Sequence, residues 1–145
     1  AARSELWVQT WHPQHALFAA LRRHDYGAFA AVQLAEREAA GLPPFTHLAL
    51  LRAEARSVDA ATGFLRAAAE DIAAIDAGRD VSVYPPVPPA VSRVADVERM
   101  QMLLESPSRA ALQRLLAQWL PRLHAMRAAH RGLMRWAIDV DPLTI

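Results

Sequence analysis

Residues 46–57, THLALLRAEARS, predict a strand that leads directly into a capped helix. We expect the strand to span residues 46–55, with the apolar run 48–51 at its centre. Ser57 is a favoured N-cap residue, and the helix after it continues to Gly78, because glycine commonly ends helices. The apolar face of this helix consists of Ala61, Phe64, Leu65, Ala68, Ile72 and Ile75.

Three further strands and one further helix are predicted after this first strand and helix. They are a short strand at 81–84, an extended proline-rich loop at 85–89, a strand at 99–105 with Met100, Met102 and Leu104 on one face, a helix that buries Leu112, Leu115, Leu116, Trp119, Leu123 and Met126, and a final strand at 134–140. Pro121 lacks a backbone N–H, which costs about 3 kcal/mol inside a helix, so we expect a kink or a break there. The order β-α-β-β-α-β predicts an α+β fold, the ferredoxin-like sandwich with two helices on one face of an antiparallel sheet.

The first 43 residues are predicted to form a separate part of the chain. Residues 5–10 alternate polar and apolar side chains and therefore indicate a strand. The sequence shows no earlier strand with which this strand could pair. Helices are expected at 13–24 and 26–40, with Asp25 as the N-cap of the second helix and Gly41 at its end. Prolines 43 and 44 cannot continue a helix, so we place the boundary between two domains, 1–43 and 44–145, at this point. The unpaired strand suggests that the chain is the C-terminal part of a larger protein.

Composition excludes some kinds of function. The 145 residues include no cysteine, so there is no disulfide and no thiolate zinc site, and no apolar run approaches the length of a membrane span. All 16 basic residues are arginine, a bias that is also typical of a GC-rich genome, and the net charge is +1. Residues 1–78 carry 7 arginines and 9 acids, whereas residues 79–145 carry 9 arginines and 6 acids. The second half is therefore consistent with a weak phosphate-binding face.

The sequence shows no convincing pattern of catalytic residues. His12 and His15 could be half of a metal site, but the further ligands that a metal needs are not found at a suitable spacing. Asp139 and Asp141 lie on the same side of a strand, as paired catalytic acids would, although they can equally bind turn amides or an arginine such as Arg135. The sequence has no glycine-rich phosphate loop and no nucleophile motif, so we expect no catalytic residue in this chain.

One helix start has the residues of an anion site. We expect Ser106 to be the N-cap of the last helix and Pro107 its first residue, which places Arg109 in the first turn. Free backbone amides and a guanidinium together can bind a carboxylate. Gln113 lies one turn further along the same face. The alternative is an ordinary solvated arginine, the commoner situation for an exposed charge.

Several stretches of the sequence together carry a family resemblance. In chain order they are Val8-Gln9-Thr10-x-x-Pro13-x-His15, His24-Asp25-Tyr26-x-x-Phe29, Leu34-Ala35-Glu36-Arg37, Pro43-Pro44-Phe45, Leu51-Arg52-Ala53-Glu54, Arg93 after the proline loop, Arg99-x-Gln101, Ser108-Arg109-x-x-Leu112-Gln113 and Ile138-Asp139-Val140-Asp141-Pro142. Together these stretches resemble the C-terminal end of the bacterial primosomal replication-restart helicases, the primosomal protein N′ family. They span nearly the whole chain. The sequence departs from the family at Pro85, where glycine is usual, and near Glu98, where an aromatic residue is usual.

This resemblance carries several expectations about function. Residues 1–43 would finish the second helicase lobe, and the rest would be the C-terminal domain of an ATP-dependent 3′–5′ DNA helicase of the bacterial cytoplasm. The parent would bind ATP, Mg²⁺ and Zn²⁺ upstream of this chain, and would act with other primosome proteins. The resemblance implies that Arg109 and Gln113 bind the acidic tail of single-stranded DNA-binding protein. Branched and single-stranded DNA would bind through Arg93, Arg99 and Gln101. A structural lid that braces the helicase lobes without touching a ligand is the alternative, and an unrelated ferredoxin-like regulatory domain is a third.

Overall fold

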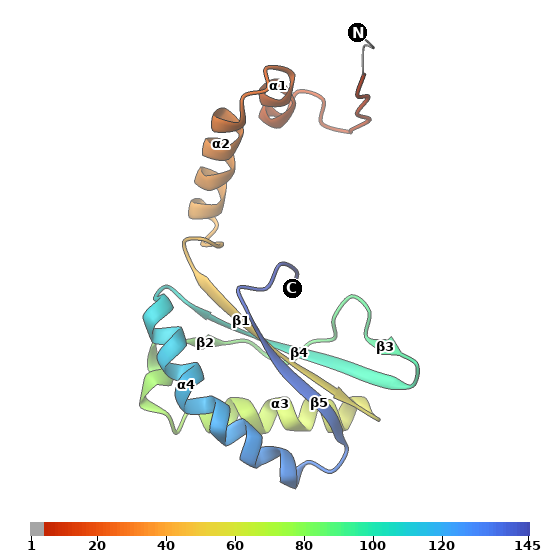
Figure 1. The fold of residues 1–145 in the computed structure, drawn as a ribbon, viewed down its shortest axis with the longest axis vertical. Helices are drawn as coiled ribbons and strands as arrows, with labels where there is room; N and C mark the ends of the chain where they lie inside the picture. Colours follow the sequence, from red (N-terminus) through yellow and green to blue (C-terminus); the bar gives the residue numbers. More distant parts are fainter. Residues whose placement is uncertain (1–4) are drawn as a thin grey trace. The chain divides into compact units, whose positions relative to one another are not determined.

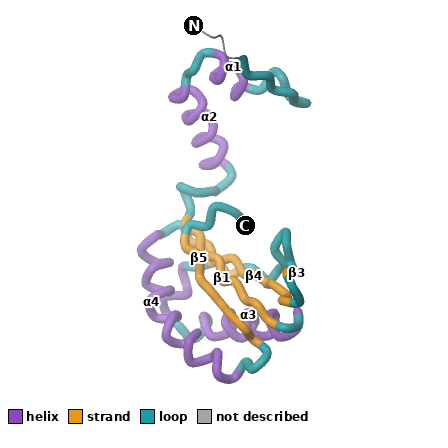
Figure 2. Tube along the Cα trace, turned by 45° about the vertical axis from the view of Figure 1, so that its right-hand side comes forward, coloured by secondary structure: helices purple, strands orange, loops and turns teal. Residues whose placement is uncertain are grey.

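The computed structural model describes residues 5–145, which form two compact units divided between Leu42 and Pro43 (Figures 1 and 2). In the first unit, helix α1 (Ala16–Arg22) and helix α2 (Tyr26–Ala39) pack against each other. Asp25 is the N-cap of α2, as predicted, because its Oδ1 accepts a hydrogen bond of 2.9 Å from the backbone N–H of Ala28. No helix among the described residues is long and apolar enough to cross a membrane.

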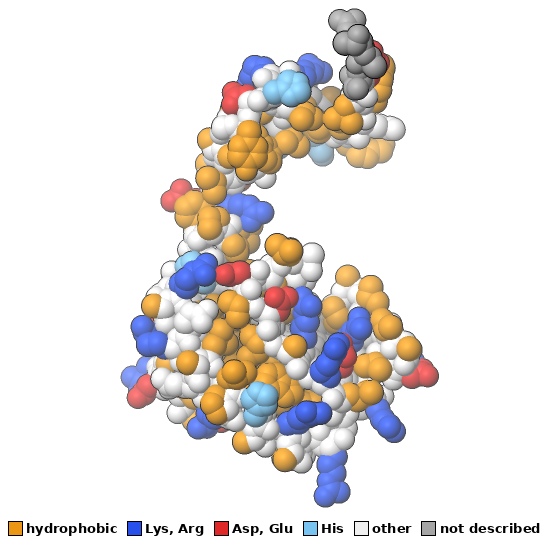
Figure 3. Space-filling model, in the orientation of Figure 1, with side chains coloured by type: hydrophobic (Ala, Val, Ile, Leu, Met, Phe, Trp, Pro, Cys, Tyr) orange, Lys and Arg blue, Asp and Glu red, His pale blue; other side chains and the backbone are white. Residues whose placement is uncertain are grey.

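The strand predicted at residues 5–10 is wrong. These residues have no regular secondary structure, and the side chains of Leu6, Trp7 and Trp11 are exposed. A strand requires a neighbour for its backbone N–H and C=O groups, and alternation in the sequence does not supply one. Among the described residues 5–42, Ala20 is the only buried apolar residue, and Figure 3 shows apolar side chains over the surface of this unit.

The second unit is an antiparallel sheet with two long helices, and the predicted α+β, ferredoxin-like arrangement is confirmed. Its elements are β1 (His47–Ala55), α3 (Val58–Ile72), the 3₁₀ turn η1 (Asp76–Asp80), β2 (Ser82–Val83), β3 (Arg93–Val94), β4 (Val97–Ser106), α4 (Arg109–Met126), the 3₁₀ turn η2 (Arg127–Ala129) and β5 (Leu133–Val140). The strand order is β2-β4-β1-β5, with the short β3 also paired to β4.

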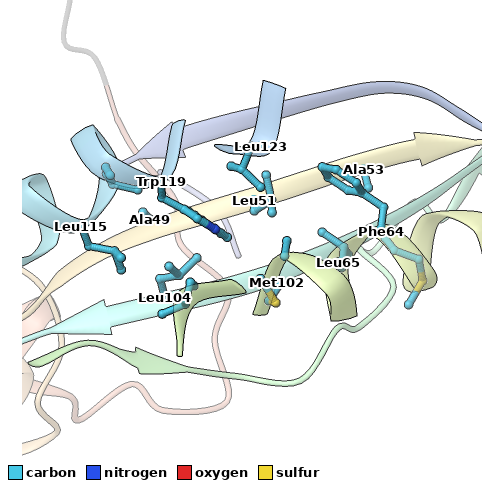
Figure 4. Packing of buried hydrophobic residues seen from close by; sticks show 14 of the residues in the cluster. Ala49, Leu51, Ala53, Phe64, Leu65, Met102, Leu104, Leu115, Trp119 and Leu123 are labelled. Carbon is cyan, nitrogen blue, oxygen red and sulfur yellow. The ribbon is translucent and has the colours of Figure 1, made fainter. Parts of the chain in front are cut away.

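The hydrophobic core lies between the sheet and the two helices (Figure 4). Alternate residues of β1 and β4 face the helices, because side chains on a strand alternate between its two sides. The fully buried side chains shown there are Ala49, Leu51 and Ala53 of β1, Phe64 and Leu65 of α3, Met102 and Leu104 of β4, and Leu115, Trp119 and Leu123 of α4. These are the apolar faces predicted from the sequence, with Trp119 as the largest buried side chain.

The first helix of this unit ends earlier than predicted. Ser57 caps α3 as expected, since its Oγ accepts a hydrogen bond of 3.2 Å from the Ala60 N–H. The helix stops at Ile72, however, and Gly78 lies inside the following 3₁₀ turn. A Cβ atom at position 78 would lie 2.8 Å from the carbonyl oxygen of Ile72. Gly78 is therefore required by close packing and not by the end of the helix.

The start of α4 also differs from the prediction. Ser108 is the N-cap, and its Oγ accepts a hydrogen bond of 3.2 Å from the Ala111 N–H. Ser106 instead ends β4, where its buried hydroxyl donates to the Asp80 carbonyl oxygen at 2.8 Å. The helix then runs through Pro121 without a break to Met126. The break that we named as one outcome at this proline is therefore absent, whereas the kink stays a prediction, and packing of the buried face of α4 outweighs the lost hydrogen bond.

Candidate ligand-binding surfaces

The face of the sheet opposite the helices carries a row of charged side chains. On β1, Arg52 and Glu54 alternate with core residues and so point to this face. Strand pairing places Gln101 of β4 opposite Arg52, and Arg99 of β4 opposite Glu54. On the other side of β1, Arg135 of β5 is opposite Glu54. Side chains of directly paired residues lie on the same face, so these charges from three strands are neighbours.

Glu54 connects two of the arginines. Arg135 donates from Nε to Glu54 Oε2 at 3.1 Å and from its terminal nitrogen to Oε1 at 2.9 Å. Nε of Arg99 lies 3.4 Å from the same Oε1, and this nitrogen is buried without a hydrogen bond. The hydrogen bonds from Arg135, together with the charges of Arg135 and Arg99, lower the pKa of Glu54 below its ordinary value of 4.5. Glu54 therefore remains a carboxylate at neutral pH and holds both guanidinium groups in place.

These residues line a groove of about 510 Å³, which we call the arginine groove. Its lining consists of Arg52, Ala53, Glu54, Pro89, Ala90, Val91, Arg99, Gln101, Arg135, Trp136, Ala137, Thr144 and Ile145. The proline-rich loop reaches this side of the sheet because Val87 and Gln101 exchange two backbone hydrogen bonds of 2.8 Å each. One wall of the groove is thus apolar and the floor is charged, a combination that suits an anionic ligand with an apolar part.

Arginines outnumber acids in and around the arginine groove. Arg52 also pairs with Asp139, at 3.1 Å, so three arginines face two carboxylates. Arg93, which was predicted to act with Arg99 and Gln101, does not line the groove. Its guanidinium lies at 2.7 Å from a carboxylate oxygen of Asp96, across the turn between β3 and β4. In Figure 3, arginine and acidic side chains lie next to one another on the second unit.

A second charged surface lies at the first turn of α4. Arg109 is the first residue of the helix, and its guanidinium is 3.2 Å from Oδ2 of Asp141, just beyond the end of β5. The two side chains are 62% and 46% exposed. Gln113 is exposed one turn further along α4. The two acids of the C-terminal stretch thus pair with Arg109 and Arg52, whereas Arg135, the partner suggested from the sequence, pairs with Glu54.

The remaining candidates form no chemical site among residues 5–145. No group of three or more histidine, aspartate or glutamate side chains in this described part could hold a metal ion. His15 instead caps α1, because its Nδ1 accepts a hydrogen bond of 3.2 Å from the Leu17 N–H. Sequence reasoning named Arg99 and Gln101 but missed Arg52, Glu54 and Arg135 as members of one cluster. The alternation Arg52-Ala53-Glu54 within an apolar strand was the available signal.

The fold and its two charged surfaces define a ferredoxin-like α+β domain with exposed arginines on the open face of its sheet and at the start of α4. The chain belongs to the family described as the primosomal protein N C-terminal domain, whose model matches residues 38–143. This membership confirms the family resemblance drawn from the sequence.

Relatives that match nearly the whole of this chain carry the name replication restart protein PriA. The protein of Haemophilus influenzae is 34% identical over 140 residues, which are 97% of this chain and 18% of that protein. The Synechocystis protein is 29% identical over 141 residues (95% of this chain and 16% of that protein), and the Bacillus subtilis protein is 26% identical over 135 residues (93% and 16%). The chain therefore spans less than a fifth of the length of these relatives.

Proposed function

We propose that this chain is the C-terminal module of an ATP-dependent 3′–5′ DNA helicase of replication restart, and that it helps the helicase to hold branched DNA and to recruit single-stranded DNA-binding protein. Family membership and the names of the relatives support a role in replication restart. The arginine groove is the observation that carries the DNA-binding part of the proposal. Residues 1–43 would complete the second helicase lobe, which would cover the exposed apolar side chains of Leu6, Trp7 and Trp11.

DNA would bind the arginine groove through its phosphates. Arg52, Arg99 and Arg135 are set on three adjacent strands, so one backbone could contact several guanidinium groups. Gln101 lines the same floor, but it is only 6% exposed, so its carboxamide would add at most one neutral contact there. Because two acids neutralise part of the charge, binding is weak, independent of base sequence and steeply dependent on salt.

The DNA proposal is tested by the salt dependence of binding. A labelled fork is titrated with the 145-residue chain at several salt concentrations. Arg99→Ala and Arg135→Ala should each lower the slope of log K against log salt by about 0.9 if the contact is to duplex DNA, and by about 0.7 if it is to a single strand. Arg66→Ala is the matched control, since Arg66 is an exposed arginine on α3, which packs against the other face of the sheet. Unchanged slopes for both groove variants, or binding that does not depend on salt, would leave the structural lid as the better explanation.

The acidic tail of single-stranded DNA-binding protein would bind at Arg109 and Gln113. The Arg109 guanidinium is exposed and already binds one carboxylate at 3.2 Å, so it could also donate hydrogen bonds to a carboxylate of another chain. Gln113, exposed one turn away, would hydrogen-bond the peptide backbone next to that carboxylate. Arg109 contributes charge and Gln113 a neutral contact, so the two substitutions should have unequal effects.

The tail proposal is tested in the complete protein with a labelled peptide of the tail. Arg109→Ala should weaken binding about tenfold, the low end for a charge-assisted hydrogen bond because the side chain is 62% exposed. Gln113→Ala should weaken it about fivefold at most. Arg66→Ala controls for the loss of one surface arginine, and the same peptide with an amidated C-terminus shows whether the terminal carboxylate matters. Equal affinities for wild type and Arg109→Ala would make Arg109 an ordinary solvated arginine.

Catalysis and its cofactors are assigned to the rest of the parent protein. Because the sequence has no cysteine and no phosphate loop, we propose that ATP, Mg²⁺ and Zn²⁺ bind outside this chain. Other primosome proteins would meet the parent at replication forks in the bacterial cytoplasm.

A further inference from the structure

Asp141 is the ion-pair partner of the Arg109 guanidinium within this chain. It follows β5 directly, and its backbone N–H donates a hydrogen bond of 2.9 Å to the Leu48 carbonyl oxygen of β1. Its φ angle is +54°, the left-handed region that few side chains adopt readily. This backbone is therefore held in an uncommon conformation at the point where the carboxylate reaches Arg109, 3.2 Å away. One terminal nitrogen of the Arg109 guanidinium, which a carboxylate from another chain could also bind, is therefore already engaged by Asp141.

We infer that Asp141 competes with the carboxylates of the acidic tail for Arg109, and so lowers the affinity of this site for single, weakly held anions. The inference rests on the tail-binding function proposed above, and it describes how that same site is regulated. An exposed ion pair is weak, because water and salt screen both charges. A tail that brings several carboxylates and a peptide backbone for Gln113 therefore displaces Asp141 more readily than a lone acid does.

The opposite role is a positioning one, in which Asp141 orients Arg109 so that the tail can bind. The two roles predict opposite signs when the charge of Asp141 is removed. Competition predicts tighter binding of the tail, since Arg109 is released. Positioning predicts weaker binding, since Arg109 loses its support.

The test uses Asp141→Asn in the complete protein, with the labelled tail peptide as probe. Asparagine tolerates the left-handed backbone and keeps the N–H that bonds to Leu48, so only the charge is lost. Asp139→Asn is the matched control, because Asp139 lies two residues away, pairs with Arg52 and is 44% exposed against 46% for Asp141. Asp141→Asn should tighten binding about two- to fivefold, the range for an exposed ion pair. Asp139→Asn should leave it unchanged, and high salt should remove the difference.

A double variant separates failure of the inference from failure of the tail site. In an Arg109→Ala background, Asp141→Asn should not change the affinity for the tail peptide, because the guanidinium for which Asp141 competes is no longer present. If Arg109→Ala weakens the peptide but Asp141→Asn does not tighten it, the competition is overturned while the tail site stands. If Arg109→Ala has no effect, the tail site itself is wrong. If Asp139→Asn tightens binding as much as Asp141→Asn, the effect is one of net charge, and the specific competition is overturned.

Discussion

Replacement of Glu54 by glutamine removes the charge that holds two arginines of the groove. The substitution keeps the size of the side chain and one acceptor oxygen, so the change is mainly the loss of the carboxylate. Hydrogen bonds to charged groups contribute about 1.5–3 kcal/mol when they are shielded, and exposed ion pairs about 0.2–1 kcal/mol. Glu54 is 21% exposed, whereas Arg135 is 71% exposed. We therefore expect Glu54→Gln to lower the free energy of unfolding by about 1 kcal/mol at pH 7.

The same reasoning gives the sign of the pH dependence. The pKa of Glu54 in the folded chain lies below its ordinary value of 4.5. A lowered pKa means that its contribution to stability is present above pH 4.5 and is lost as the pH falls through the folded-state value. The glutamine variant has no such group to protonate. The difference in unfolding free energy between wild type and Glu54→Gln should therefore shrink as the solution is acidified below pH 4.5.

Thermal unfolding at a series of pH values measures both effects. At pH 7 the Tm of Glu54→Gln should be about 4 °C below that of wild type, the shift that 1 kcal/mol gives in a chain of 145 residues. Asp76→Asn is the control. Asp76 pairs with Arg79, but the Asp76 side chain is 93% exposed and the Arg79 side chain 82% exposed. This pair should therefore contribute less than about 0.5 kcal/mol to the free energy of unfolding. A Tm gap that stays constant down to pH 3 would show that the pKa of Glu54 is not lowered by its arginines, and the proposed organisation of the groove would be refuted.

Two further predictions concern packing in the second unit. Gly78→Ala should lower the free energy of unfolding by about 1–3 kcal/mol, because the new Cβ would lie 2.7 Å from Cγ2 of Ile72 and 2.8 Å from its carbonyl oxygen. Gly63→Ala, inside α3 with no atom within 4 Å of the new Cβ, should instead raise it by up to about 1 kcal/mol, and urea denaturation compares the two. Trp119→Ala should cost about 3–5 kcal/mol in the same assay. Trp119→Phe should cost clearly less than Trp119→Ala, because the phenylalanine ring still fills most of the buried volume, and neither variant loses a hydrogen bond, since the buried indole N–H has no partner. Equal losses for both Trp119 variants would contradict that reasoning.

The order and type of the core elements could be predicted because periodicity and capping are local signals. The apolar face of α3 and the alternation on β4 both appear in the structure as buried faces. Ends of elements were less predictable, since they depend on distant contacts. Ser106 and Ser108 are equivalent as caps in the sequence, and the choice between them is made by the Asp80 carbonyl oxygen, which takes the Ser106 hydroxyl.

The short hairpin of β3 and β4 had no usual sequence signal. Its turn residues, Ala95 and Asp96, have φ angles of +46° and +63°. Two positive φ angles in a two-residue turn are usually marked by Asn-Gly or Asp-Gly, and neither is present here. The ion pair from Arg93 to Asp96 and the backbone pairing of β3 to β4 hold the turn. Arg93, predicted as a DNA contact, pairs with Asp96 in this turn, and its side chain is still 62% exposed, so the predicted contact stays a prediction.

The arginine groove could not be assembled from the sequence, because its members come from three strands whose pairing is set by the whole fold. Arg135 meets Glu54 across 81 residues of chain. The strand β1 joins this surface to the core, since Arg52 and Glu54 alternate along it with residues that are buried under the helices. Alanine at position 53 is small enough to let the helices pack against the sheet, and the alternation of side chains along β1 places Arg52 and Glu54 on the opposite side. Stability and the proposed ligand binding therefore share one strand, so a slip in the register of β1 by one residue would expose the core and bury Arg52 and Glu54 together.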